Sequence, residues 1–472
     1  MRRTFITTPL LVALLSGCAI SRDYANYERP AAPIPASLPD EGIYAPLPSA
    51  AQAGLAWQEL IQDENLTELV QTALTNNRDL ASAVANIGMA RALYRAQSSE
   101  RLPTISAGVS TGSTDVTSSS SGVNSYAANI GLSAFEIDLF GRVQSLTQAE
   151  RESYLSSRAA AESTRISLIA EIATSYVTLA ADQELLALAQ RTEASRERSL
   201  QLTLALNNAG LASKVDVRQA ETNLASARSD IAASMTQVAQ DKNALALLLG
   251  VPYEERWNPP ALETVEQHIS TVPIGLSSTI LLARPDVMQA EHELMGANAN
   301  VDAARAALFP TISLTSSLGF ASNALASLFT GGAFGVPASG SASIDIFGGD
   351  RPANLEFSKA ERALYQAQYE KAIQTAFREV ADALARAATI EEQMQAQNDL
   401  VRSAGESLIL ANARYSKGID DYFSVLDAQR TAYSAEQSRI ATLLAKISNR
   451  ITQYRVIGND RDDGWTAKIS TR

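Results

Sequence analysis

The 472-residue chain contains one cysteine and two histidines, which leaves few side chains for metal or redox chemistry. Cys18 has no second thiol with which to form an internal disulfide. His268 and His292 do not form an HExxH spacing, and the sequence has no Walker A loop, Rossmann fingerprint or CxxC pair. We therefore predict no metal site, no bound cofactor and no enzymatic activity.

Positive charge is also scarce. The chain has 39 Lys and Arg residues against 51 Asp and Glu residues, so its formal net charge is −12. A strongly acidic protein repels the phosphate backbone, and nucleic-acid binding is therefore not expected. The acidity by itself does not identify a substrate.

Helix-breaking residues are absent from a long central stretch. No proline occurs at 104–251 and no glycine at 142–209. Residues at spacings of three and four form an apolar stripe there, as an amphipathic helix requires; they are Ile166, Ile169, Ala173, Val177 and Ala180. We predict a helix of about 65 residues, roughly 100 Å long. A turn at Gly210 then leads into a second helix from Val215 to Leu249, with the stripe Leu224, Ala227, Ile231, Met235 and Val238.

The first residues have the pattern of a processed leader. Arg2 and Arg3 precede a short apolar run, and Leu-Ser-Gly-Cys at 15–18 resembles a bacterial lipobox. We predict that residues 1–17 are a lipoprotein signal peptide and that Cys18 carries covalent lipid, the only attached group expected. Ala19 follows, and the absence of Asp there indicates sorting to the outer membrane. The Pro-rich segment that begins the mature chain, within 18–56, is predicted to be an extended strap.

The sequence also repeats itself. The pattern around Pro103 returns around Pro310, and the pattern around Asp138 returns around Asp345, both 207 positions later (310 − 103 and 345 − 138). Gly210 recurs as Gly418. We predict an internal duplication, with repeats at 57–250 and 284–457, a linker at 251–283 and a tail at 458–472.

Each repeat is expected to contain a pair of strands. Between Pro103 and Gly141 apolar residues alternate with small polar ones, first in one register and then, from Phe135 through Ile137 and Leu139, in another. The second copy places Ile312, Leu314, Leu318 and Phe320 on one face, followed after a Gly-rich loop by Ala342, Ile344 and Ile346. An aromatic belt at a membrane interface is consistent with five phenylalanines near the strands, although ordinary packing is an alternative for Phe140 and Phe347: Phe135, Phe140, Phe309, Phe320 and Phe347.

Neither the strand pairs nor the helix hairpins can be stable in a single chain. Four short strands leave unpaired edges, and a bilayer admits only helices or closed barrels, of which the smallest have about eight strands. A long helix hairpin likewise lacks enough core to bury its stripe. Both arguments predict a symmetric oligomer that forms a continuous tube.

Several stretches resemble the TolC-type outer membrane factors, particularly the lipoprotein branch that contains OprM and NodT. The matching segments are 77–80, 135–142, 284–286, 290–295, 303–316, 369–383 and 414–430. The resemblance covers essentially the entire mature chain. It implies a mainly α fold with membrane β: a homotrimeric, twelve-stranded barrel with four strands per chain, continuous with a long periplasmic α-helical barrel. It also implies a multidrug-type efflux duct without a catalytic centre, whose partners are outer-membrane lipid, a periplasmic adaptor and an inner-membrane transporter.

The resemblance further implies a gate at the periplasmic tip, where Gly210 and Gly418 turn the helix hairpins. Tyr415 matches a tyrosine before the second turn, Asp216 an aspartate that bonds towards it, and Asp427 an aspartate that lines the constriction. Ser424 stands where TolC has another acidic residue. Asp420 and Asp421 either supply the missing negative charge or cap the returning helix.

Three other interpretations remain open from the sequence. The same channel could serve type I protein secretion instead of small-molecule efflux. A periplasmic adaptor lipoprotein also combines a lipobox with a helical hairpin, but has one hairpin between β-domain halves. A non-conducting envelope spacer would have no use for the strand pairs.

Overall fold

The computed structural model describes residues 27–44, 55–114, 123–275, 277–330, 333–346 and 349–458. These residues belong to two compact units. The first, unit 1, contains Ile87–Ser157 and Gln289–Glu370 together with 27–31, and the second, unit 2, contains Ala32–Asn86, Arg158–Met288 and the residues from Lys371 onward. The signal peptide, Cys18, Phe347 and all of the tail except Gly458 lie outside the described residues.

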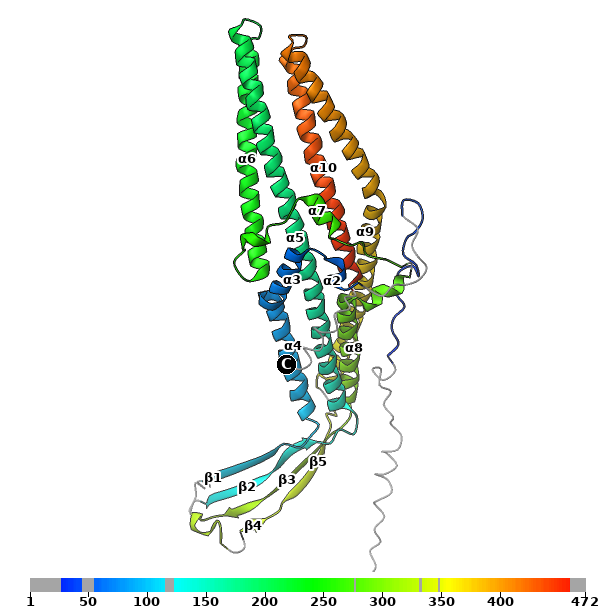
Figure 1. The fold of residues 1–472 in the computed structure, drawn as a ribbon. Coiled ribbons are helices and arrows are strands. Elements are labelled where there is room, and N and C mark those ends of the chain that lie inside the picture. The colour runs from blue at the N-terminus through cyan, green and yellow to red at the C-terminus, as the bar shows by residue number, and fades with distance from the viewer. Residues whose placement is uncertain are drawn as a thin grey trace, which may run out of the picture. The chain divides into compact units, whose positions relative to one another are not determined.

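The chain forms helices, 3-10 helices (η) and strands, which Figure 1 labels in order from the N-terminus. They are α2 (Trp57–Leu60), α3 (Glu64–Asn76), α4 (Arg78–Ser99), β1 (Ile105–Thr114), β2 (Val123–Glu136), α5 (Arg142–Asn208), α6 (Lys214–Leu249), η1 (Glu255–Trp257), α7 (Leu262–Gln267), η2 (Ser278–Ala283), α8 (Pro285–Ala306), β3 (Thr311–Ser322), η3 (Leu325–Ser327), β4 (Phe334–Gly335), β5 (Ala338–Ser343), α9 (Arg351–Ser416) and α10 (Tyr422–Ile457).

The predicted long helices are confirmed. Helix α5 has 67 residues and α9 has 66. The helical stretch before β1 is interrupted at Asn77, which ends α3 and whose Oδ1 accepts the Leu80 amide at the start of α4. A second break, at residues 61–63, was not predicted; there the Asp63 side chain caps α3 by accepting the Leu66 amide.

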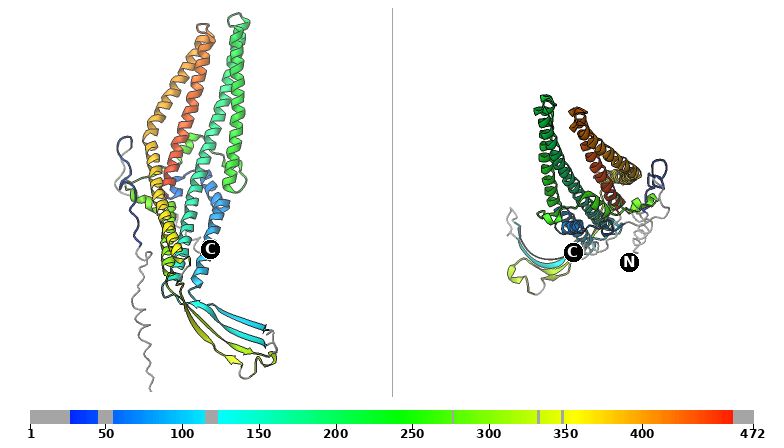
Figure 2. Two further views of the ribbon diagram at one scale, coloured as in Figure 1. Left: turned by 180° about the vertical axis from the view of Figure 1, so that it is seen from behind. Right: turned by 45° about the horizontal axis from the view of Figure 1, so that its top comes forward.

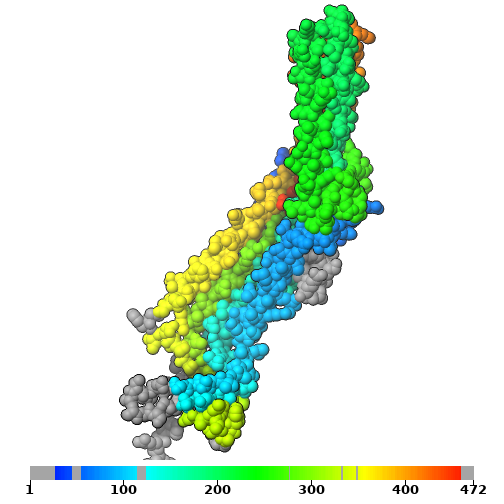
Figure 3. Space-filling model, turned by 90° about the vertical axis from the view of Figure 1, so that its left-hand side faces the viewer, coloured from blue at the N-terminus to red at the C-terminus, as the bar shows by residue number. Residues whose placement is uncertain are grey.

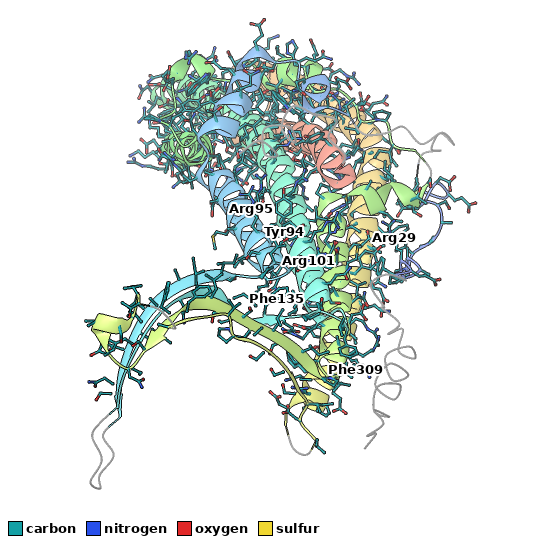
Figure 4. The ribbon with its side chains drawn as sticks, turned by 90° about the horizontal axis from the view of Figure 1, so that it is seen from below. Arg29, Tyr94, Arg95, Arg101, Phe135 and Phe309 are labelled. Atoms are coloured by element: carbon teal, nitrogen blue, oxygen red, sulfur yellow. The ribbon has the colours of Figure 1, made fainter. Side chains whose placement is uncertain are left out.

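Unit 1 contains one curved antiparallel sheet, visible in Figures 1 and 4. Its order is β1-β2-β3-β4, and β5 also pairs with β3. Strands β4 and β5 follow one another along the same partner, separated by Val336 and Pro337. Proline has no amide hydrogen, so it interrupts the ladder. The five strands of the described chain therefore fill four positions in the sheet.

The change of register expected before Phe135 is explained by a β-bulge, but β2 ends at Glu136, so the prediction that the strand continues through Ile137 and Leu139 is wrong. The pairing of Leu132 with Ser316 is followed by that of Phe135 with Leu314, so Ser133 and Ala134 face the single residue Thr315. Ala134 has a positive φ of 49°, and its amide donates to Thr315 Oγ1 at 3.0 Å. The extra residue returns Phe135 to the face that carries Leu132.

The prediction that Ile344 and Ile346 continue the last strand is wrong. Strand β5 ends at Ser343, which pairs with Thr311, the first residue of β3. Pro310 precedes Thr311 and has no amide hydrogen, so it cannot donate a hydrogen bond that would extend the pairing between β3 and β5. Ile346 is consequently 95% exposed.

Within unit 1, polar contacts tie α8 to the N-terminal strap and to α5. Arg29 donates from Nε and Nη2 to the two carboxylate oxygens of Glu291 on α8, at 2.6 and 2.8 Å. Glu152 of α5 is fully buried, and its Oε2 lies 2.7 Å from His292 Nδ1. The described part of the N-terminal strap, 27–44, contains no helix or multi-residue strand, only bends, a turn and one isolated bridge at Ser37.

Unit 2 contains two helix hairpins, in which α5 lies beside α6 and α9 beside α10 in both Figures 1 and 2. All five residues of the predicted α5 stripe are buried. The α6 stripe is only partly so: Leu224 and Ala227 are buried, whereas Met235 is 58% exposed. Ile231 and Val238 are half-buried, and α6 lies at the surface of the single chain on the side drawn in Figure 3.

The C-terminal ends of α6 and α10 are closed in the same way. Asn77 Nδ2 donates to the Leu248 carbonyl at 2.8 Å, and Arg284 Nη1 donates to the Val456 carbonyl at 2.6 Å. Each helix then ends in a left-handed glycine, at Gly250 and at Gly458. These donors satisfy carbonyls that a helix end leaves unpaired.

The linker between the repeats is packed and contains short helices. Its residues pair with the early chain: the Ser270 amide donates to the Leu60 carbonyl and the Gln62 amide to the His268 carbonyl, both at 2.9 Å. Helix α7 is held on α10 by ion pairs, including Arg439 with Glu263 at 2.8 Å. This segment is therefore a fixed part of unit 2.

Candidate functional site

The described residues contain no group of three or more His, Cys, Asp or Glu side chains that could hold a metal ion. No helix within the described ranges has both the length and the apolar character needed to cross a membrane. The candidate sites are therefore surfaces: the turns of the two helix hairpins in unit 2, and the two faces of the sheet in unit 1.

Both hairpin turns have the same glycine geometry. Gly210 and Gly418 have φ values of 74° and 68°. After Gly210 the Leu211 amide donates to the Leu206 carbonyl at 2.8 Å, and after Gly418 the Ile419 amide donates to the Arg414 carbonyl at 3.0 Å. This is the Schellman pattern, which requires a left-handed residue that glycine adopts without strain.

Two of the predicted gate carboxylates cap helices. Asp216 forms a capping box with Ser213: its Oδ2 accepts the Ser213 amide at 2.8 Å, and Ser213 Oγ accepts the Asp216 amide at 3.1 Å. Asp421 is the N-cap of α10, and its Oδ1 accepts the Ser424 amide at 3.2 Å. Each carboxylate lies at the positive end of a helix dipole, which stabilises its negative charge.

Asp420 does not cap the helix but pairs with a cation across the turn. Arg414 Nε and Nη2 donate to its two oxygens at 2.6 and 2.8 Å. These hydrogen bonds hold the pKa of Asp420 below its ordinary value and raise the pKa of Arg414. The pair is solvent-exposed, so we expect it to fix the shape of the turn more than to stabilise the fold.

Tyr415 packs inside a small core between the two hairpins. It is 5% exposed and clusters with Ala220 of α6 and with Tyr422, Val425 and Leu426 of α10. Its hydroxyl lies 3.1 Å from Thr203 Oγ1 of α5. Burial raises the pKa of Tyr415, so the phenol stays neutral. Within the described chain Tyr415 thus bonds Thr203, while the Asp216 carboxylate is engaged by Ser213.

A polar row on α5 joins the hairpins below this core, and sequence reasoning missed it. Ser199 Oγ accepts from Gln429 Nε2 at 2.9 Å, and Arg196 Nη1 donates to the Asn223 carbonyl at 2.8 Å. The Arg196 guanidinium also lies over the Tyr433 ring, 5.5 Å from its centroid. Arg196, Ser199 and Thr203 recur at spacings of three and four, which was the available signal.

A buried carboxyl pair between α5 and α6 was likewise not predicted. Asp241 is 9% exposed, and its Oδ1 accepts from Gln237 Nε2 at 2.9 Å. Burial and the neighbouring Asp241 carboxyl raise the pKa of Asp182 to about 7. Two carboxyl groups this close favour a shared proton.

Asp427 differs from the other predicted gate residues. It is exposed, and within the described residues its side chain has no hydrogen bond or ion pair. The apolar side chains nearest the turns are exposed as well: Leu211 77%, Val215 63%, Ile419 59% and Phe423 63%. The hairpin ends therefore present unpaired charge and uncovered apolar surface together.

The sheet has two chemically distinct faces. On the apolar face the ladder aligns Val109 with Ala128, Ile130 with Leu318, and Ala128 with Phe320. The other face, which we call the hydroxyl face, carries alternate residues of each strand. They are the even-numbered residues of β1 from Ser106 to Gly112, the odd-numbered residues of β2 from Ser125 to Gly131, and the odd-numbered residues of β3 and β5. All of these are Ser, Thr, Asn, Gly or Ala.

Aromatic clusters stand at both ends of the apolar face. Phe140 and Phe309 stack with ring centroids 4.8 Å apart, at the end where Figure 4 labels Phe309. Phe320 meets Phe329 and Phe334 edge-on at 5.4 and 5.5 Å. The membrane belt remains a prediction; of its five phenylalanines, Phe140, Phe309 and Phe320 belong to these clusters.

Comparison with known proteins identifies close relatives along nearly the whole chain. The family model described as "Outer membrane efflux protein" matches residues 69–251 and 276–459. The toluene efflux pump outer membrane protein TtgC of Pseudomonas putida is 41% identical over 474 residues, covering 98% of this chain and 96% of that protein. The antibiotic efflux pump outer membrane protein ArpC of Pseudomonas putida is also 41% identical, with the same coverage. The open-state crystal structure of the Neisseria gonorrhoeae MtrE outer membrane channel superposes with a TM-score of 0.83 at 32% identity, covering 92% of this chain and 98% of that one.

Proposed function

Since this chain belongs to the outer membrane efflux protein family, we propose that it is the outer-membrane exit duct of a tripartite efflux system. It works as a homotrimer whose sheets close into one barrel and whose helix hairpins form a periplasmic tube. It receives solutes from an inner-membrane transporter through a periplasmic adaptor. The two matches of the family model, one in each half of the chain, support the internal duplication.

The observation that carries the proposal is a two-faced sheet with open edges. Within the described residues β1 pairs only with β2, and β5 only with β3. Their outer edges leave rows of amide and carbonyl groups, each of which costs several kcal/mol if left unpaired in a bilayer. Pairing β5 of one copy with β1 of the next satisfies them, and three copies of four strand positions give twelve strands.

The aromatic clusters support the membrane placement by their spacing. Phe309 and Phe320 are 11 positions apart, about 37 Å along a strand at 3.4 Å per residue. With a strand tilt of about 40°, this spans roughly 28 Å across the membrane, close to the apolar band of about 25 Å on outer-membrane barrels. The uncharged apolar face between the clusters then meets lipid.

The helices support the same stoichiometry. Met235, a member of the stripe predicted on α6, is 58% exposed. A neighbouring chain that packs against this side of α6 would cover Met235 and complete the stripe. One chain would thus supply a third of the tube.

The hairpin turns are suited to bind the adaptor. Leu211 and Val215 on the first hairpin, and Ile419 and Phe423 on the second, offer apolar contacts at the end of each turn. We propose that this surface docks the adaptor and that the nearby Asp427 lines the gate, with Tyr415, Asp216, Asp420 and Asp421 holding the tip around it. Three copies of Asp427 around a narrow aqueous opening would attract cations.

The names of the relatives suggest the transported compounds, and the N-terminal signal sequence suggests the lipid anchor. Because relatives are named for toluene and antibiotic efflux, we propose organic solvents and antibiotics as the transported class. Acylation at Cys18 would hold the mature N-terminus in the outer membrane.

Purified, acylated protein in planar bilayers tests the channel directly. We expect heat-modifiable trimers and discrete ionic conductance, and a deletion strain should become sensitive to toluene and lipophilic antibiotics. Protein that migrates as a monomer and never conducts would refute the proposal. Normal susceptibility with an intact channel would refute only the cargo.

A further inference from the structure

We propose that the hydroxyl face of the sheet forms an uncharged wall of the duct, so that this section passes solutes without selecting them by charge. The inference rests on the proposed channel and names a property of its cargo: ionisable solutes of either sign cross the strand section equally well. Selection by charge is left to the helical part, above all to the tip.

The composition of the face is the first support. None of the described β1, β2, β3 and β5 residues that define the hydroxyl face is ionisable. The hydroxyls also bond one another, as Ser313 Oγ and Ser341 Oγ do at 2.8 Å across β3 and β5. A wall of neutral dipoles can replace the hydration of a passing solute without attracting one sign of charge.

Among the described strand residues, the one ionisable side chain that continues this face beyond the bulge is paired with a cation. Glu136, opposite Ser313 at the end of β2, accepts from Arg142 Nε at 2.9 Å and Nη2 at 2.5 Å. A bidentate pair has no net charge, so its field falls off quickly with distance.

Close strand packing restricts the face to small side chains. A Cβ added to Gly131 would lie 2.5 Å from Ser317 Cα, and one added to Gly319 would lie 2.6 Å from Asn129 Cα. No real Cβ tolerates such distances to backbone atoms. At Gly131 and Gly319 themselves the geometry therefore excludes any side chain, charged ones included.

Neighbouring serines on β3 give a matched test, because they point to opposite faces. Ser317 opposes Gly131 on the hydroxyl face, and Ser316 opposes Leu132 on the apolar face. Ser317→Cys and Ser316→Cys are made in the acylated trimer, where Cys18 carries lipid and offers no thiol. Each is treated in bilayers with a cationic and an anionic methanethiosulfonate, and rates are divided by those of a free thiol in solution.

We expect Ser317→Cys to react with both reagents, with normalised rates equal to within about twofold in 0.1 M salt, and Ser316→Cys to be protected. Phe423→Cys, one helical turn before Asp427, should favour the cationic reagent. A preference of about tenfold or more at Ser317→Cys, for either sign, would overturn the inference. Reaction at Ser316→Cys in place of Ser317→Cys would overturn the assignment of the faces.

Charge added to the wall should produce the selectivity that the native wall lacks. Three charges roughly 10 Å from the axis, screened over one Debye length, change the K⁺/Cl⁻ permeability ratio by about fivefold in 0.1 M salt. Ser317→Asp should raise the ratio and Ser317→Lys should lower it, by similar factors. Trimers that conduct but show no such shifts would sink the inference alone, whereas protein that never conducts would sink the proposed function as well.

Discussion

The hydrogen bond between Thr203 and Tyr415 makes a directional prediction, because its two ends are not equivalent. Thr203 Oγ1 lies 2.9 Å from the Ser199 carbonyl, to which it donates, and 3.1 Å from the Tyr415 hydroxyl. The tyrosine must therefore donate to the threonine. Both side chains are buried, Thr203 at 0% and Tyr415 at 5% exposure.

The two single substitutions should lower the free energy of unfolding by different amounts. Tyr415→Phe keeps the ring in its core and leaves Thr203 bonded to Ser199, so we expect the loss of one hydrogen bond, about 1 kcal/mol per chain. Thr203→Val leaves the tyrosine hydroxyl buried without a partner, which costs about 1–3 kcal/mol. If opening separates the hairpins in all three chains at once, even Tyr415→Phe shifts the open-to-closed ratio by about 100-fold.

Thermal unfolding and single-channel open fraction measure both effects. Thr203→Val should melt lower and open more often than Tyr415→Phe, and Thr203→Ser, which keeps the hydroxyl, should behave like the wild type. The double variant should recover part of the loss, since it has no orphaned donor. Unchanged melting and gating in both single variants, or a larger loss in Tyr415→Phe, would refute the reasoning.

Four further predictions concern separate parts of the chain. Asp427→Ala should raise single-channel conductance and weaken cation preference; equal values in the two proteins would remove Asp427 from the gate. Gly319→Ala should lower the yield of heat-modifiable trimer, because its Cβ would lie 2.6 Å from backbone, whereas Gly340→Ala, with its nearest atom at 4.0 Å, should not. The raised pKa of Asp182, about 7, means that the folded state binds the proton more tightly, so stability should fall as pH rises from about 4 to 7. Asp182→Asn should remove that slope and gain about 1–2 kcal/mol at pH 8, after allowance for partial exposure; parallel melting curves for both proteins across this range would exclude the shared proton. Cys18→Ser should lose the acyl mass on intact-mass spectrometry, and an unchanged mass would show that Cys18 carries no lipid.

Local patterns in the sequence predicted the elements well, for physical reasons. The absence of proline and glycine made α5 continuous, and the stripe from Ile166 to Ala180 is buried because helix periodicity alone decides which side faces a core. The double register of β2 was visible before its cause, since a bulge shifts alternation by one residue. The strand predicted at Ile344 and Ile346 failed because the pattern of one strand says nothing about where its partner ends.

The contacts at the tip could not be predicted, because they join residues far apart in the chain. Thr203 and Tyr415 are separated by 212 positions, and nothing local marks a threonine as the partner of a tyrosine. Arg196 reads as a solvent-facing charge until α10 is placed beside α5. The sequence left two roles for Asp421, charge at the gate or capping of the returning helix, and the structure directly supports capping.

The mass of the acylated protein in mild detergent, measured by native mass spectrometry and followed by bilayer recording of the same species, tests the central claim most directly. We predict three chains per particle and a conducting pore. A stable particle of one chain that forms no pore would contradict the account.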